Sequence, residues 1–120
     1  MTVSLPESVS PQPPTRVRLR ALRAEDLDAV LALLARHGHP ARSRAGLQWA
    51  LIDNPSRVSL GAEAGWVLED AQTVVGFIGN LPLRALVDGL AVWCAGGTTP
   101  VVDALYRAHG IRLVRAFASQ

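Results

Sequence analysis

The segment 101–114 carries residue types that suit an anion-binding site. Its sequence is VVDALYRAHGIRLV, which reads as the end of a strand, a short polar connection with one glycine, and the start of a helix. A strand that enters a helix in this way leaves backbone N–H groups unpaired beside the positive end of the helix dipole. Gly110 would let the backbone pass close to an anion, and Arg107 and Arg112 would add positive charge at its rim. The pattern predicts a site for a phosphate-bearing ligand.

Other interpretations of this segment compete with that prediction. The spacing fits neither the G-x-x-x-x-G-K-[ST] phosphate loop nor the G-x-G-x-x-G dinucleotide motif. The less favoured alternative is a solvated strand-to-helix connection with arginines on its surface. His109 lies inside it, where it would either donate to an anion or remain a surface side chain.

The run 102–111 resembles the signature of the GNAT acetyltransferases, in which a fourth strand is followed by an [RQ]-x-x-G-x-[GA] loop and a helix. Arg107 and Gly110 fit the first and fourth positions of that loop. Arg112 stands where the family usually has Gly or Ala, and Ala104 stands where many members have proline. Arg112 would therefore either crowd a pyrophosphate or contact it.

Two upstream runs are similar to the same family. Residues 20–27 resemble its first strand entering its first helix, and residues 74–79 resemble its third strand. The resemblance covers about residues 16–120. It implies transfer of an acetyl or other acyl group from a coenzyme A thioester, as co-substrate, to an amine on a small molecule or peptide.

The resemblance also implies roles for particular residues. The backbone of the fourth strand would meet the pantetheine arm of acyl-CoA, and the loop would bind its pyrophosphate. The residues implied in coenzyme binding are Val101, Val102, Arg107, Ala108, His109, Gly110, Ile111 and Arg112. Catalytic residues stay unassigned, because the family often uses a tyrosine beyond a fifth strand and the only tyrosine here, Tyr106, precedes that position.

The first half of the chain must supply the frame for this segment. Residues 17–22 alternate apolar and charged side chains, which predicts a half-buried strand. Residues 25–36 have apolar side chains at helical spacing, and a second, shorter helix is expected from Ser43 to about Asn54-Pro55. The chain therefore opens as strand, helix, helix.

The second half of the chain reads as strands followed by a helix. Residues 65–69 and 73–79 predict two antiparallel strands. Asp88-Gly89 predicts a tight hairpin leading into a strand over 90–102, with Gly96-Gly97 as the place for a bulge or a ligand's approach.

The last segment returns to helical periodicity. The apolar residues expected to form one buried face of this final helix are Ile111, Val114 and Phe117. No internal repeat interrupts this order of elements.

These elements predict an α/β (α+β) fold similar to GNAT. The expected fold is a mostly antiparallel mixed sheet of about four strands, with two helices after strand 1 and one after strand 4. Residues 1–15, rich in proline and serine, are expected to be a disordered tail, and residues 16–120 the N-terminal half of the domain. We expect the chain to stop before a fifth strand, which leaves the fourth strand an unpaired edge and favours a homo-oligomer or a complementing chain.

Composition excludes several classes of function. A formal net charge of +2, carried by arginines spread along the chain, argues against nucleic-acid binding. No apolar run approaches the length of a membrane span, and one cysteine with no secretory signal predicts a cytoplasmic protein. His37 and His39 lack the partners of a metal site. Cys94 is expected to be a small core residue, and Glu69 and Asp70 solvated acids at a turn.

A second function hypothesis comes from a different class. In it the chain is a non-catalytic, GNAT-like remnant or interaction module that binds coenzyme A weakly or not at all. Arg112 in the loop and the expected absence of a second half favour that alternative.

Overall fold

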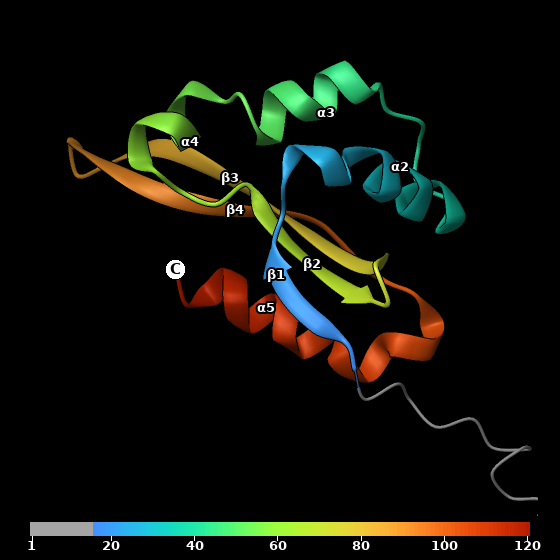
Figure 1. Cartoon of the computed structure of the whole chain (residues 1–120). Helices are drawn as coiled ribbons and strands as arrows, with labels where there is room; N and C mark the ends of the chain where they lie inside the picture. The colour runs from blue at the N-terminus through green and yellow to red at the C-terminus, as the bar shows by residue number, and fades with distance from the viewer. Residues whose placement is uncertain (1–15) are drawn as a thin grey trace, which may run out of the picture.

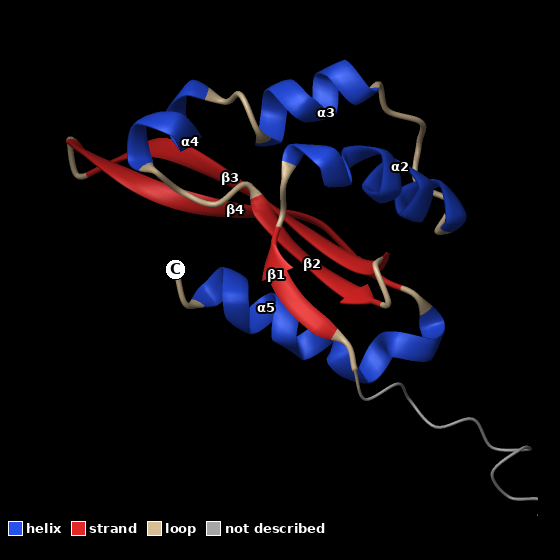
Figure 2. Cartoon of the chain, viewed as in Figure 1, coloured by secondary structure: helices blue, strands red, loops and turns tan. Residues whose placement is uncertain are grey.

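The computed structural model describes residues 16–120, so the expected tail over residues 1–15 lies outside the described part. Figure 1 shows a sheet with helices on both faces, and Figure 2 shows the same view by secondary structure. The elements in chain order are β1 (Arg18–Ala21), the 3-10 helix η1 (Ala24–Asp26), α2 (Leu27–Arg36), α3 (Arg44–Leu51), α4 (Pro55–Leu60), β2 (Gly65–Asp70), β3 (Thr73–Val87), β4 (Leu90–Val102), the 3-10 helix η2 (Ala104–His109) and α5 (Gly110–Ala118).

The four strands form one antiparallel sheet in the order β1-β2-β3-β4. The predicted α/β fold with four strands is therefore confirmed. β1 and β4 lie at the two edges, and β3 pairs with both β2 and β4. The Asp88-Gly89 turn has positive φ at both residues, as a tight hairpin requires, and it joins β3 to β4 as predicted.

The helices lie in two groups on opposite faces of the sheet, with α2, α3 and α4 on one face and α5 on the other (Figure 1). Ser43 caps α3 by accepting a hydrogen bond from the Gly46 N–H, which confirms the expected cap. α4 is an additional helix that the prediction omitted. Asn54 and Pro55 do end the preceding helical segment, but Asn54 also caps α4, and Pro55 opens it at a position where no N–H is needed.

The core lies on both sides of the sheet because alternate strand residues face opposite helices. Toward α2 and α3 the buried side chains include Leu27, Leu33, Leu51, Val67, Phe77 and Val101. Toward α5 they are Val17, Leu68, Val75, Ile78 and Leu113, with Trp66 and Phe117 packed against them edge to face at 6.5 Å. The central strands are therefore apolar on both faces.

The helical face of α5 differs from the predicted one. Leu113 is buried, whereas Ile111 and Val114 are about half exposed, and Phe117 is half buried. α5 begins at Gly110 and lies against the sheet beside β2 and β3, so the face that includes Leu113 and Phe117 meets the apolar strands. Ile111 and Val114 are also at helical spacing, but they lie on a more exposed part of the helix surface.

Three further expectations about strand residues are corrected. Cys94 lies on the exposed part of β4 rather than in the core. β4 runs through Gly96-Gly97 without a break. A Cβ at Gly97 would lie 3.3 Å from the Phe117 ring, so the absence of a side chain at Gly97 leaves room for Phe117. Glu69 and Asp70 are not simply solvated, since each contacts a partner from a distant part of the chain.

Candidate functional site

The outer edge of β4 is the first feature of the candidate site. Within residues 16–120 no strand pairs with this edge, so its backbone groups face outward. Phe77 pairs with Val101 and Gly79 with Thr98, so Ile78 alone faces the two residues Thr99 and Pro100. Thr99 has φ of 49°, and the bulge bends β4 just before Val101 and Val102.

The turn after β4 is tighter than the sequence predicted. Instead of an open polar loop, Ala104–His109 form η2, which runs directly into α5. The Tyr106 N–H donates to the Asp103 carbonyl and the Gly110 N–H to the Arg107 carbonyl, so part of the donor set is used internally. Gly110 adopts an ordinary helical conformation, with φ of −58°, and does not need the freedom of glycine.

Asp103 fixes the start of this turn to α2. Its carboxylate accepts hydrogen bonds from Arg36 Nη2 at 3.0 Å and from His37 Nε2 at 2.8 Å, and its backbone N–H donates to Val75. Burial alone would raise the pKa of Asp103, but the hydrogen bonds and charges of Arg36 and His37 outweigh it, so the pKa lies below its ordinary value.

The direction of the Asp103 carboxylate matters for an anion nearby. Asp103 occupies the N-cap position of η2, where aspartate commonly binds the first N–H groups, yet it makes no such capping bond. Its charge is instead held by Arg36 and His37. The positive end of the turn is therefore not neutralised by the residue best placed to do so.

Two more contacts hold the turn from other sides. The Tyr106 hydroxyl donates to Asp70 Oδ2 at 2.6 Å, and this hydrogen bond raises the pKa of Tyr106 above its usual value. Arg112 Nη1 donates to the Val17 carbonyl at 2.8 Å and lies 3.2 Å from His109 Nδ1. The guanidinium of Arg112 is thereby held toward the start of β1. These contacts tie the turn to β2 and to the residue before β1.

The structure brings the predicted coenzyme-binding residues together at one end of β4. Val101 and Val102 are the last residues of that strand, and η2 and the first turn of α5 follow within the next ten residues. Arg107 and Ala108 are exposed, as is Ile111, while His109, Gly110 and Arg112 are half buried. Sequence reasoning missed Arg36, His37 and Asp70, because their contacts with the turn span 67, 66 and 36 residues and leave no local pattern.

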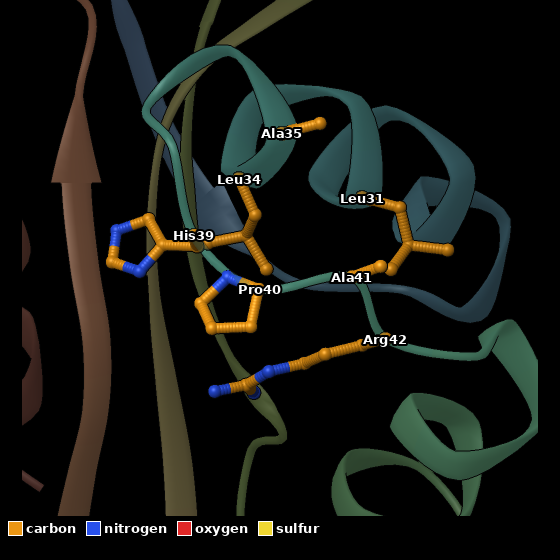
Figure 3. Close-up of a pocket in the computed structure, with 7 residues that line it drawn as sticks. All are labelled: Leu31, Leu34, Ala35, His39, Pro40, Ala41 and Arg42. Carbon is orange, nitrogen blue, oxygen red and sulfur yellow. The ribbon is translucent and has the colours of Figure 1, made fainter.

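A second feature lies where the α2–α3 connection approaches β4. A cavity of about 150 Å³ is lined by Leu31 and Leu34 from α2 and by His39, Pro40 and Arg42 from the connection, as Figure 3 shows. A neighbouring cavity of about 280 Å³ lies between Arg42 and α3. Arg42 Nη2 donates to Thr99 Oγ1 at 3.3 Å, which ties this region to the bulge.

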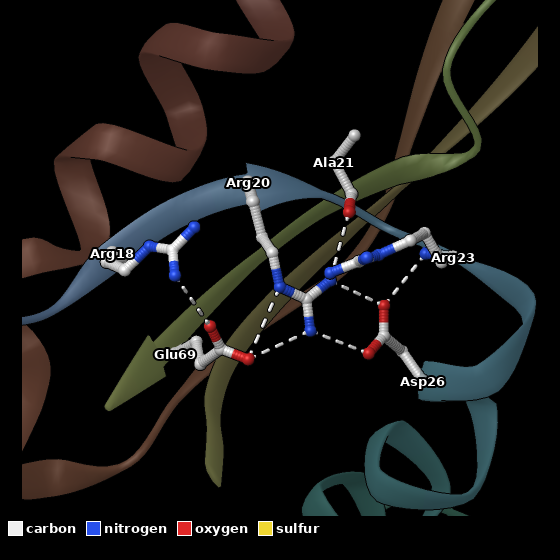
Figure 4. A network of polar contacts seen from close by, with 6 residues as sticks. All are labelled: Arg18, Arg20, Ala21, Arg23, Asp26 and Glu69. Carbon is white, nitrogen blue, oxygen red and sulfur yellow. Dashed lines mark hydrogen bonds and ion pairs between the residues drawn. The ribbon is translucent and has the colours of Figure 1, made fainter. Parts of the chain in front are cut away.

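The largest ionic network lies elsewhere and has a structural role. Arg20 on β1 makes a two-pronged ion pair with Asp26 at 2.7 and 2.8 Å and also reaches Glu69 on β2 at 3.1 Å (Figure 4). The same Asp26 accepts the Arg23 N–H. The network fixes the entry into α2 onto the sheet, and its side chains are satisfied by one another.

The described residues form neither of two further kinds of feature, a metal centre or a membrane-spanning helix. In residues 16–120 no group of three or more His, Cys, Asp or Glu is arranged to hold a metal ion. None of the helices in the same range is long and apolar enough to cross a bilayer.

Comparison of the structure with known ones identifies the fold. A GCN5-related N-acetyltransferase from Kribbella flavida matches 86% of this chain with a TM-score of 0.65 and 25% identity, and the match covers 26% of that chain. A ribosomal-protein-alanine N-acetyltransferase from Brucella melitensis matches with a TM-score of 0.57 and 23% identity, over 86% of this chain and 70% of that one.

A third solved structure extends the similarity. The N-myristoyltransferase of Saccharomyces cerevisiae with bound myristoyl-CoA matches 99% of this chain and 32% of its own, with a TM-score of 0.64 and 16% identity. The chain thus spans between 26% and 70% of the length of these three proteins. The sequence itself matches no protein-family model and no curated protein. The chain has the fold of the GNAT, or acyl-CoA N-acyltransferase, superfamily.

Proposed function

We propose that this chain acts in acyl-CoA-dependent N-acyl transfer, with the edge of β4 and the turn after it as the coenzyme site. The pantetheine arm would pair with the backbone of Val101 and Val102, much as an added strand would. The pyrophosphate would lie against the exposed side of η2 and the start of α5, near Arg107 and Gly110.

The observation that best supports this proposal is that the fold itself does not require a glycine at position 110. A Cβ at this position would meet only Val102 Cγ2, at an ordinary 3.5 Å, and the backbone is helical. The fold therefore has no requirement for glycine here. A ligand that approaches the backbone closely does supply such a requirement.

The proposed reaction balances without a further reactant. The nitrogen of the amine attacks the thioester carbonyl carbon, an N–C bond forms, and the C–S bond breaks. The proton lost by the nitrogen ends on the coenzyme thiolate, which leaves as free thiol. The bulge at Thr99 and Pro100 lies beside the arm's proposed path, and Arg42 of the α2–α3 connection donates a hydrogen bond to Thr99, so the cavities of that connection adjoin the bulge.

The non-catalytic alternative is favoured by two other observations. Hydrogen bonds inside η2 occupy N–H groups that a pyrophosphate would need, and the Arg112 guanidinium is directed to the Val17 carbonyl. In that alternative the chain keeps the fold and the contacts of the turn but does not process acyl-CoA.

A transfer assay separates these functions. The chain is incubated with acetyl-CoA and a panel of amines, free thiol is measured, and the acetylated product is identified by mass spectrometry. The proposal predicts a product that is lost in Gly110→Val. Acetyl-CoA binding without product with any amine would favour the non-catalytic alternative.

A further inference from the structure

Arg42 is an exposed arginine that lies between the two cavities described above. It lines both cavities of the α2–α3 connection, and in Figure 3 its guanidinium and the His39 ring point away from α2 toward the strands. Its guanidinium donates a hydrogen bond to the neutral hydroxyl of Thr99, at 3.3 Å. Within residues 16–120 it has no carboxylate at ion-pair distance, whereas Arg18, Arg20, Arg36 and Arg44 each have at least one.

The walls of the two cavities offer Arg42 no opposite charge. Their remaining lining is apolar apart from His39, Ser43 and Gly46, and it contains no acidic side chain. The Ser43 hydroxyl already accepts the Gly46 N–H as the cap of α3. A plain alkylammonium ion would meet a like charge here, while a carboxylate would meet a two-pronged donor.

The position of Arg42 relates this charge to the candidate chemistry. Its hydrogen-bond partner Thr99 is a bulge residue, one residue before Pro100 and two before Val101. In the proposed function the pyrophosphate lies at η2 and the pantetheine arm at Val101 and Val102, so the thioester at the other end of the arm would lie toward Thr99. An anion held by Arg42 would therefore lie beside the thioester. A small molecule held there by one end can present its other end to the bulge.

We propose that the amine acceptor also carries a carboxylate, which Arg42 binds in these cavities. The inference rests on the proposed function for the identity of the reaction, but the carboxylate site itself stands on the contacts of Arg42. The substrate class is that of small amino acids and related amino carboxylates rather than polyamines or simple alkylamines.

The first test measures binding without coenzyme. Glycine, β-alanine and 4-aminobutyrate, and the primary amide of each, are titrated into the isotope-labelled chain, and NMR shifts of the Arg42 side chain and the Thr99 amide are followed. At least one acid should produce saturable shifts that its amide does not. The chain-length series then gives the spacing between amine and carboxylate.

Matched variants locate the effect. Arg42→Gln should weaken binding of that acid at least about tenfold, because a charge-assisted bond is lost. Arg44→Gln is the control, since Arg44 is exposed like Arg42 but pairs with Asp28 and lines neither cavity. Equal binding of acid and amide, or an equal loss in Arg44→Gln, would overturn the assignment.

A second arm separates this inference from the proposed function. Acetyl-CoA is added with each acid and amide, and thiol release is measured. Acids that bind at Arg42 in a chain that does not use acetyl-CoA would leave the carboxylate site standing and remove the proposed function. Turnover of the amides as fast as the acids would support the proposed function and remove the carboxylate site.

Discussion

At the scale of single residues, the strongest contacts hold the frame rather than the candidate site. The side chains of Arg20, Asp26 and Glu69 are only 14%, 7% and 13% exposed. Because water reaches them poorly, the positive charge of Arg20 and the two carboxylates stabilise one another. Arg18 also pairs with Glu69, but at 3.9 Å and with a side chain 74% exposed. Burial therefore distinguishes two arginines that are two residues apart on the same strand.

We predict that Arg20→Ala lowers the free energy of unfolding by about 3 kcal/mol, because it leaves two poorly hydrated carboxylates without their partner. Arg18→Ala is the matched control and should change it by less than about 0.5 kcal/mol, as expected for an exposed pair. Urea unfolding followed by circular dichroism measures both. Similar values for the two variants would show that the network is not the support described.

The same network predicts how stability depends on pH. The hydrogen bonds from Arg20, partly opposed by burial and assisted by the Arg23 N–H, lower the pKa of Asp26 below its ordinary value. The unfolded chain then binds more protons, so the contribution is present above the unfolded pKa, about 3.9, and is lost as pH falls through the lower folded pKa.

Asp26→Asn should therefore flatten the fall in stability between about pH 5 and the acid limit, relative to the unmodified chain. Asp28→Asn, at an exposed side chain paired only with Arg44, should keep that fall. Urea midpoints at a series of pH values test this. An unchanged acid slope in Asp26→Asn would contradict the assignment.

Residue types predicted part of the candidate site and hid the rest. Residue types in a strand-to-helix connection, together with the resemblance to the GNAT signature, indicate Arg107 and Gly110, and both lie at the turn between β4 and α5. The positions of Asp103 and Arg112 side chains were not predictable, because they depend on Arg36, His37 and Val17, which only the folded chain brings near. Local patterns carry no information on such distant partners.

At the scale of elements, a glycine sets how closely α5 packs on the sheet. A Cβ at Gly76 on β3 would lie 2.8 Å from Leu68 Cδ1, 3.2 Å from Leu68 Cβ and 3.3 Å from Leu113 Cδ1. Leu68 and Leu113 are both fully buried, so neither can move away freely. The absence of a side chain at Gly76 is thus part of the α5 interface.

We predict that Gly76→Ala destabilises the chain by about 1–3 kcal/mol through overpacking. Gly110→Ala is the matched control within the same pair of elements, since its Cβ meets only ordinary contact, and its stability should be equal or slightly higher. Thermal unfolding of the two variants measures the difference. Equal stability of both would mean that α5 is not packed as described.

The order of the elements was predictable, and their details were less so. Strand alternation, helical spacing and the Asp88-Gly89 turn predicted β1, α2, α3, the hairpin and α5. α4 was missed because Asn54-Pro55 was interpreted as an ending, although the same pair also starts helices. η2 was missed because a polar segment with a single glycine resembles a loop when its distant contacts are unknown.

At the scale of the whole molecule, the far part of the β3–β4 hairpin is the least covered region. The hairpin projects beyond the body of the sheet (Figure 1), and its exposed apolar residues include Leu83, Leu86, Val87, Leu90 and Trp93. It also carries the outer edge of β4. Exposed apolar groups beside an unpaired edge favour association with another chain or segment.

We predict that the purified chain associates in a concentration-dependent way and that the double variant Leu86→Lys and Leu90→Lys reduces this association. Both leucines are more than two thirds exposed, so the change should leave the core intact. Sedimentation velocity over a range of concentrations tests it. A chain that stays monomeric at all concentrations before substitution would contradict the prediction.

The central claim of the account is that the end of β4 and the turn after it bind acyl-CoA. The most direct measurement is calorimetric titration of the folded chain with acetyl-CoA, alongside Gly110→Ala and Gly110→Val. The account predicts saturable binding that weakens with the size of the added side chain while circular dichroism stays unchanged. Absence of binding by the folded chain, or equal binding by all three proteins, would contradict it.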